Sequence, residues 1–131
     1  MRKKMLHLAI AGTTIASTLA LSAQSALAAA DFTVVSGLGF DHGANLVAAT
    51  GTITDHTSGN DAVAVQTFIQ RLLDTGSWVT VATGPRRTGV NTATSAIGAR
   101  SCINGATYRA QVNWNWNNIR RGTKYSAPNV C

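Results

Sequence analysis

The stretch YRAQVNWNWNNIRRG, residues 108–122, alternates so regularly that it decides the fold class. Successive side chains of a β-strand point to opposite faces of the sheet. One face of this stretch carries Tyr108, Ala110, Val112, Trp114 and Trp116, and the opposite face carries Arg109, Gln111, Asn113, Asn115 and Asn117. The first face is therefore expected in a core and the second in solvent, as in an antiparallel sheet that is covered on one side.

Similar runs of β-forming residues surround this stretch, and turns rich in Gly, Asn and Asp separate them. The expected strands are residues 32–40, 46–54, 62–73, 78–83, 90–98, 107–116 and 123–131. No segment shows a convincing helical period, so helices are disfavoured. The pattern predicts an all-β, antiparallel sandwich of about seven strands. A barrel of the same strands is the structural alternative.

The first 28 residues have the composition of a secretory signal peptide. A positive start at Arg2, Lys3 and Lys4 precedes an apolar middle, and small residues at Ala26 and Ala28 form a cleavage pattern. The apolar part contains Thr and Ser and falls short of the roughly 20 apolar residues of a membrane span. Cleavage is expected after Ala28, with positions 29 and 30 as near alternatives. The sequence thus predicts a signal peptide, residues 1–28, and one secreted domain, residues 29–131, with no transmembrane segment left.

The charge of the expected mature domain is modest. It has eight basic residues against five aspartates, which is a net charge of +3, and it contains no glutamate. A nucleic-acid partner usually requires a dense basic face. Nucleic acid is therefore an unlikely partner on this criterion.

Two cysteines, Cys102 and Cys131, remain in the expected mature chain. An even pair in a small domain from an oxidising compartment is best interpreted as a disulfide. If seven antiparallel strands alternate in direction, the fifth and the seventh end at the same pole. The two cysteines then lie at the same pole, opposite the turns that follow the second, fourth and sixth strands, and strand direction leaves the lateral distance between them open.

The tryptophans of the alternating stretch have two interpretations. Trp114 and Trp116 continue the row of Tyr108 and Val112, which favours burial in the core, and Trp78 is also expected to be largely buried. A platform for stacking sugars or bases needs aromatic rings that face water beside polar groups. Trp116 is nearest the end of the strand and is the candidate aromatic contact.

Three stretches resemble small secreted proteins of Gram-positive bacteria with an immunoglobulin-like sandwich. They are VAVQTFIQRLLDTGSWVTVATG at 63–84, CINGATYRAQV at 102–112 and KYSAPNVC at 124–131. The matching features are a strand with Gln70-Arg71, a turn with Gly76-Ser77 before Trp78, and a later strand with Tyr108-Arg109. The resemblance covers about half of the mature chain and implies an immunoglobulin-like β-sandwich. A shared fold does not by itself transfer an activity.

Signals of catalysis or metal binding are weak. The sequence has no H-E-x-x-H, no G-x-S-x-G and no phosphate-binding glycine loop, so we expect no enzyme, no cofactor and no metal. The repeated dipeptides Asp41-His42 and Asp55-His56 offer mixed metal ligands. A strand of about nine residues between them would span about 30 Å, which places them at opposite ends of the domain. Both are better explained as turn residues.

Basic residues gather in two of the expected turns. Arg86 and Arg87 lie in GPRRTG, and Arg120 and Arg121 lie in NNIRRG with Lys124 shortly after. Alternating strand direction brings these turns to one pole, close to residues 55–61. This arginine pole is the candidate site for an anionic cell-wall polymer or an acidic protein. Solvated turn residues that only aid solubility are the plainer interpretation.

Two classes of function follow. The first is a secreted, soluble binding or interaction module that contacts an anionic surface or partner through the arginine pole. The alternative is a secreted enzyme or an antimicrobial, toxin-type protein whose site the sequence does not reveal. The lack of catalytic spacing favours the first.

Overall fold

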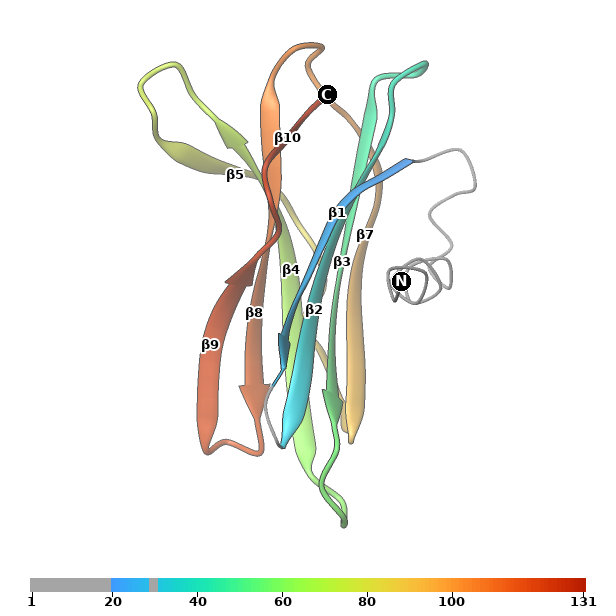
Figure 1. Cartoon of the computed structure of the whole chain (residues 1–131), viewed down its shortest axis with the longest axis vertical. Coiled ribbons are helices and arrows are strands. Elements are labelled where there is room, and N and C mark those ends of the chain that lie inside the picture. Colours follow the sequence, from blue (N-terminus) through green and yellow to red (C-terminus); the bar gives the residue numbers. More distant parts are fainter. Residues whose placement is uncertain (1–19, 29–30) are drawn as a thin grey trace.

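The computed structural model describes residues 20–28 and 31–131, whose strands form two antiparallel sheets (Figure 1). Sheet A has the order β1-β2-β3-β7, with the bounds Ala20–Ala28, Phe32–Asp41, Leu46–Asp55 and Thr92–Ser101. Sheet B contains β4 (Ala62–Leu72), β5 (Trp78–Thr83), β6 (Arg87–Val90), β8 (Thr107–Trp116), β9 (Arg120–Tyr125) and β10 (Asn129–Val130). In sheet B, β4 pairs with β8 on one side and with β5 and β6 on the other, while β8 also pairs with β9 and β10.

The strand order is that of an immunoglobulin-like sandwich. In the constant type of that fold, strands A, B, E and D form one sheet and C, F and G the other. Here β2, β3 and β7 take the places of A, B and E, and β4, β8 and β9 those of C, F and G. The strand that follows β4, β5, pairs with β4 in sheet B, whereas strand D of the constant type pairs with E, whose place β7 takes here. The prediction of an all-β antiparallel sandwich is confirmed, and the two sheets are not closed into a barrel.

The predicted signal peptide falls mostly outside the described residues. Its last part forms β1, which pairs with β2 from Ala20↔Phe40 to Ala28↔Thr33. Cleavage after Ala28 stays a prediction, and it would remove β1 and leave β2 as the edge of sheet A. The described domain from Asp31 onward keeps both sheets without this strand.

The core lies between the sheets and follows the predicted alternation. In β8 the side chains of Tyr108, Ala110, Val112 and Trp114 are buried, whereas those of the intervening residues are partly exposed. They face the buried row of β2, which consists of Phe32, Val34, Ser36, Leu38 and Phe40. Phe32 and Trp114 pack with ring centroids 4.9 Å apart. The core row of the opening stretch is therefore confirmed.

A polar link crosses the middle of this core. Thr67 of β4 donates from its backbone N–H to Ser95 Oγ at 3.0 Å and from its hydroxyl to the Ser95 carbonyl at 3.0 Å. The Ser95 hydroxyl donates in turn to the Pro85 carbonyl at 2.7 Å, and the Gly84 N–H donates to the Thr67 carbonyl at 2.8 Å. The Gly84 bond keeps the chain beside β4 after β5, so that it continues in the same direction along the first half of β4. The segment predicted as the turn GPRRTG consequently forms the short strand β6 in its second half.

The last predicted strand is divided in two. β9 and β10 are separated by Ser126, whose N–H donates to the Ala110 carbonyl and whose hydroxyl accepts from the Ala110 N–H at 2.8 Å. The side chain thus replaces one bond of the sheet ladder, and Pro128 follows, which cannot donate such a bond. Residues 123–125 and 129–130 therefore pair with β8 as two short strands and not as one continuous strand.

The end of the sandwich at which the chain terminates holds the disulfide. Cys102 and Cys131 are joined, with their Cα atoms 6.2 Å apart. Tyr108 lies beside them, and its hydroxyl accepts a hydrogen bond from the Ile103 N–H at 2.8 Å. In immunoglobulin folds, the hydroxyl of a tyrosine near the start of strand F typically forms a hydrogen bond with the backbone a few residues earlier in the chain. The predicted disulfide, including its place at one pole, is confirmed.

Candidate functional site

The structure brings only part of the predicted arginine pole together. The turns at residues 56–61 and 117–119 do meet, because the Asn117 N–H donates to the Ala62 carbonyl and its amide donates to Asp61 Oδ1 at 2.8 Å. Arg120 lies at this pole and pairs with Asp31 at 3.7 Å. Arg87 instead pairs with Val65, three residues along β4 from Ala62 and about 10 Å from the strand end. Lys124 lies opposite Val112, also away from the pole.

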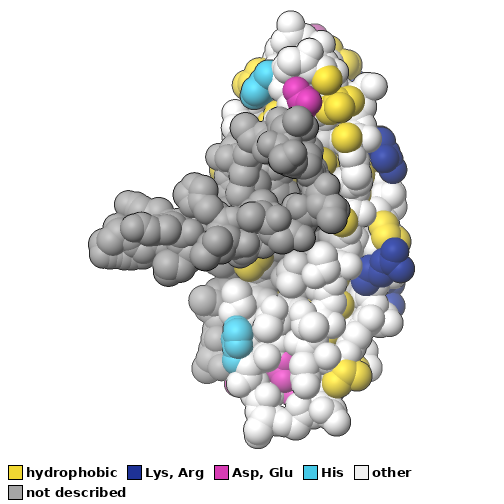
Figure 2. Space-filling view, turned by 90° about the vertical axis from the view of Figure 1, so that its right-hand side faces the viewer, with side chains coloured by type: hydrophobic (Ala, Val, Ile, Leu, Met, Phe, Trp, Pro, Cys, Tyr) yellow, Lys and Arg dark blue, Asp and Glu magenta, His cyan; other side chains and the backbone are white. Residues whose placement is uncertain are grey.

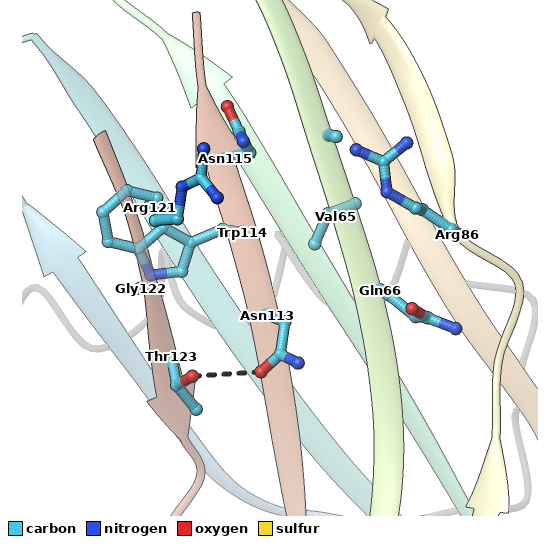
Figure 3. Close-up of a pocket in the computed structure, with 10 residues that line it drawn as sticks. Val65, Gln66, Arg86, Asn113, Trp114, Asn115, Arg121, Gly122 and Thr123 are labelled. Carbon is cyan, nitrogen blue, oxygen red and sulfur yellow. Dashed lines mark hydrogen bonds between the residues drawn. The ribbon is translucent and has the colours of Figure 1, made fainter. Parts of the chain in front are cut away.

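Arg86 and Arg121 line opposite sides of an open groove on the outer face of sheet B, the face turned away from sheet A (Figure 3). The groove has a volume of about 390 Å³. Three neighbouring strands supply its wall in register, since Gln66 lies opposite Asn113, and Asn113 opposite Thr123. Its lining residues are Ala64, Val65, Gln66, Arg86, Asn113, Trp114, Asn115, Arg121, Gly122 and Thr123.

Hydrogen bonds between side chains hold the polar wall of this groove in place. Asn113 Oδ1 accepts from the Thr123 hydroxyl and from Gln111 Nε2, each at 3.0 Å. Gln66 Nε2 donates to the Gly84 carbonyl at 3.0 Å. These bonds leave the Asn113 amide and the Gln66 oxygen to face solvent or a ligand. The groove therefore presents carboxamide groups between two guanidinium groups.

Glycine at position 122 lets β9 lie close over the core. A Cβ atom built at Gly122 would be 2.6 Å from Trp114 Cζ2, which is too close for any side chain. The flanking residues Arg121 and Thr123 are then held over the groove. The motif Arg-Arg-Gly thus places one arginine, Arg121, on the groove and the other, Arg120, beside Asp31.

Charge is segregated between the two sheets. The strands of sheet B contain Arg71, Arg87, Arg109, Arg120, Arg121 and Lys124 and no acidic residue. The five aspartates lie in sheet A or in turns. Within residues 31–131, the Arg120–Asp31 pair is the one ion pair found, so Arg86 and Arg121 have no carboxylate partner in that part of the chain.

Trp116, the candidate aromatic contact, is bound within the protein. Its ring stacks on Phe32 with centroids 5.5 Å apart, and its Nε1 donates to Asp55 Oδ1 at 2.9 Å. The ring is partly exposed, as expected at the end of the strand. Its contacts give it a structural role at the pole. Trp78, predicted as largely buried, is only partly buried and lies beside Arg109 on the outer face of sheet B.

Asp55 is the acceptor at the centre of this pole. Burial disfavours its charged form, but hydrogen bonds from the Trp116 side chain and from the hydroxyl and backbone N–H of Thr57 outweigh burial. The pKa of Asp55 consequently lies below its ordinary value. Thr57 Oγ1 also lies 2.6 Å from Asp61 Oδ2, so one hydroxyl joins two carboxylates.

Acidification is expected to weaken the fold through Asp55. Because its pKa is lower in the folded than in the unfolded chain, its bonds stabilise the fold above the unfolded value and are lost as the pH falls from roughly 5 through the folded value. The check is urea unfolding at a series of pH values, with Asp55→Asn for comparison. The variant should lose part of the acid dependence. An unchanged dependence would show that other groups cause it.

The two Asp-His dipeptides lie at opposite ends of the β2–β3 hairpin, as predicted. Asp41 pairs with Leu46 at one end, and Phe32 pairs with Asp55 at the other. Figure 2 shows histidine and acidic side chains near both ends of the face in view, and basic side chains along one margin. Asp41 Oδ1 accepts from the Ala44 N–H at 3.2 Å, which is turn chemistry. Among the described residues, no cluster of three or more His, Cys, Asp or Glu is placed to hold a metal.

Sequence reasoning missed the polar wall of the groove. Its signal was present, because Asn113 and Asn115 belong to the outward row of the opening stretch. Their meeting with Gln66, Arg86 and Thr123 depends on the order β4-β8-β9, which alternation within one strand does not reveal.

Comparison with models of known protein families gave no match, and no curated protein sequence was similar to the chain. In the described part of the chain, no helix has the length and apolar composition needed to cross a bilayer.

Proposed function

We propose that the protein is a secreted binding module that holds an anionic, hydroxyl-rich cell-wall polymer on the outer face of sheet B. The observation that carries the proposal is the charge segregation. All six strands of sheet B lack acidic residues, and Arg86 and Arg121 flank its groove without a carboxylate partner within residues 31–131. An anion that approaches this face meets attraction and no opposing carboxylate on the strands.

The groove also supports a hydroxyl-rich ligand. Asn113 and Asn115 each accept through their side-chain oxygen within the protein, so their NH₂ groups can donate to a ligand, and the Gln66 oxygen can accept. Donors and an acceptor of this kind suit the hydroxyl groups of a sugar or polyol. Guanidinium groups bind phosphate or carboxylate through two parallel hydrogen bonds. A polymer that alternates oxyanions with hydroxyl groups, such as a phosphodiester-linked polyol or an acidic polysaccharide, would use both kinds of group.

Secretion belongs to the proposal as well. The signal-like residues 1–28, the disulfide and the resemblance to secreted sandwiches of Gram-positive bacteria all favour an extracellular place of work. The groove is too open to exclude water, and this favours binding over catalysis.

The test measures binding of the disulfide-bonded mature protein, residues 29–131, to immobilised poly(glycerol phosphate), with neutral dextran as the reference. Binding to the polyanion should weaken as salt rises, because the charges involved are exposed. Arg86→Ser and Arg121→Ser should each weaken it about 3-fold, since one exposed charge contributes up to about 1 kcal/mol.

The control variant is Arg100→Ser, which removes one positive charge from an exposed position of β7, in sheet A. It should bind like the wild type. Equal binding to dextran, or equal losses in all three variants, would contradict a site on sheet B. Binding of an acidic protein that excludes the polymer would assign the face to a protein partner and would also overturn the proposal.

A further inference from the structure

A second cluster on the outer face of sheet B is built around Arg109. This residue lies on the polar side of β8, opposite Gln70 of β4, and its Nε donates to Gln70 Oε1 at 2.8 Å. Two aromatic rings contact the same guanidinium group. Its Cζ lies 4.2 Å from the ring centroid of Trp78 in β5 and 3.9 Å from that of Tyr125 in β9.

The rings hold the guanidinium group in one orientation. Both ring centroids lie at about van der Waals contact distance from Cζ, so two aromatic rings pack against the planar guanidinium group. The flat guanidinium group of arginine can stack on aromatic rings. The compact ammonium group of lysine cannot stack in this way. Gln70 then fixes rotation in the plane through the bond to Nε. The side chain has therefore lost most of its freedom before any ligand arrives.

The two terminal nitrogens of Arg109, Nη1 and Nη2, donate no hydrogen bond to residues 31–131 and can donate to a ligand. Within residues 31–131, its Nε is the one atom that donates a hydrogen bond, and the side chain forms no ion pair. The two Nη atoms form the planar fork that binds a carboxylate, sulfate or phosphate through two parallel bonds. A fork whose orientation is already fixed binds an oxyanion at a lower entropic cost than a mobile arginine.

We propose that the cluster of Gln70, Trp78, Arg109 and Tyr125 is an oxyanion-binding subsite. Resting on the proposed function, it binds a second oxyanion of the same polymer that occupies the groove. Asn113 lies four positions along β8 from Arg109, and Asn115, opposite Arg121, lies six positions from it. At about 3.4 Å per residue these separations are about 14 and 20 Å. The ligand is thus a polymer that spans several repeating units, and single units occupy one subsite at a time.

The subsite predicts a dependence on polymer length. A glycerol phosphate oligomer of about ten units should bind more tightly than a dimer, because the second contact becomes intramolecular. Arg109→Lys keeps the charge and loses the stacked fork, so it should weaken binding of the long oligomer about 10-fold or more. It should leave binding of the dimer at the groove within about 2-fold of the wild type. Arg100→Lys is the matched control, and thermal melting checks that each variant is folded.

A second measurement reports on Arg109 without the polymer. In NMR spectra of the mature protein, inorganic phosphate should shift the Nε–Hε resonance of Arg109, and Trp78→Leu should abolish this shift. If Arg109→Lys binds the long oligomer as the wild type does while Arg86→Ser weakens it, the subsite is wrong and the proposed function stands. If phosphate shifts Arg109 but no polymer binds, the subsite as an oxyanion receptor stands and the proposed function is wrong. No shift and no loss of affinity would overturn the subsite.

Discussion

Replacing Cys131 with Ser is expected to lower the free energy of unfolding of the mature domain by about 2 to 4 kcal/mol. The bond joins residues 29 positions apart and so restricts the unfolded chain strongly. It also holds the C-terminal end, where β10 has only two residues and pairs with β8 alone. Urea unfolding of wild type and variant measures the change.

Hydrogen exchange adds a local check. Residues 126–131 should exchange first in the variant, because the bonds from the Cys131 N–H to the Ala106 carbonyl and from the Gly105 N–H to the Cys131 carbonyl lose their anchor. A loss of stability below about 0.5 kcal/mol, or uniform faster exchange over the whole domain, would contradict this account of the disulfide.

The second large effect is expected at Gly51, in the middle of β3. A Cβ atom built there would lie 2.6 Å from Thr67 Oγ1 and 2.6 Å from Val112 Cγ2, both of which are buried in the facing sheet. Neither group can withdraw, because Thr67 bonds Ser95 and Val112 lies in the packed core. Gly51→Ala should destabilise the fold by about 1 to 3 kcal/mol through overpacking.

Gly98→Ala supplies the control, because Gly98 is also a strand residue and a Cβ atom built there meets nothing within 4 Å. Its free energy of unfolding should change by less than about 0.5 kcal/mol. Equal effects of the two substitutions would contradict the account in which the close approach of the sheets at Gly51 causes the loss of stability.

Sequence alone predicted what depends on alternation and on strand direction. The row from Tyr108 to Trp114 is buried because one face of β8 meets sheet A, and this requires no knowledge of neighbouring strands. Cys102 and Cys131 lie at one pole because antiparallel strands reverse direction, which holds for any order of the strands, and the lateral order then brings them into bonding distance. The burial of this row and the pole of the disulfide could therefore be predicted, whereas β6 and the division of the last strand into β9 and β10 could not.

Features that depend on which strands lie side by side in the sheets could not be predicted from the sequence. The turn composition of residues 84–89 hides β6, which forms because β4 is long enough to pair with β5 along one half and with β6 along the other. That path moves Arg86 and Arg87 from the pole to the side of β4. For the same reason Trp78 stacks on Arg109 across the intervening strand β4, so its ring lies on the outer face and not in the core.

The most direct test of binding on the outer face of sheet B is an NMR titration of isotope-labelled mature protein with a glycerol phosphate oligomer of about ten units. Resonances of the groove and of the Arg109 cluster should shift, and these are the signals of Gln66, Gln70, Arg86, Arg109, Asn113, Asn115, Arg121 and Thr123. Backbone signals of β3 and β7, in sheet A, should stay in place. Shifts confined to residues 55–61 and 117–120 at the pole, or no shifts at millimolar oligomer in low salt, would contradict the account.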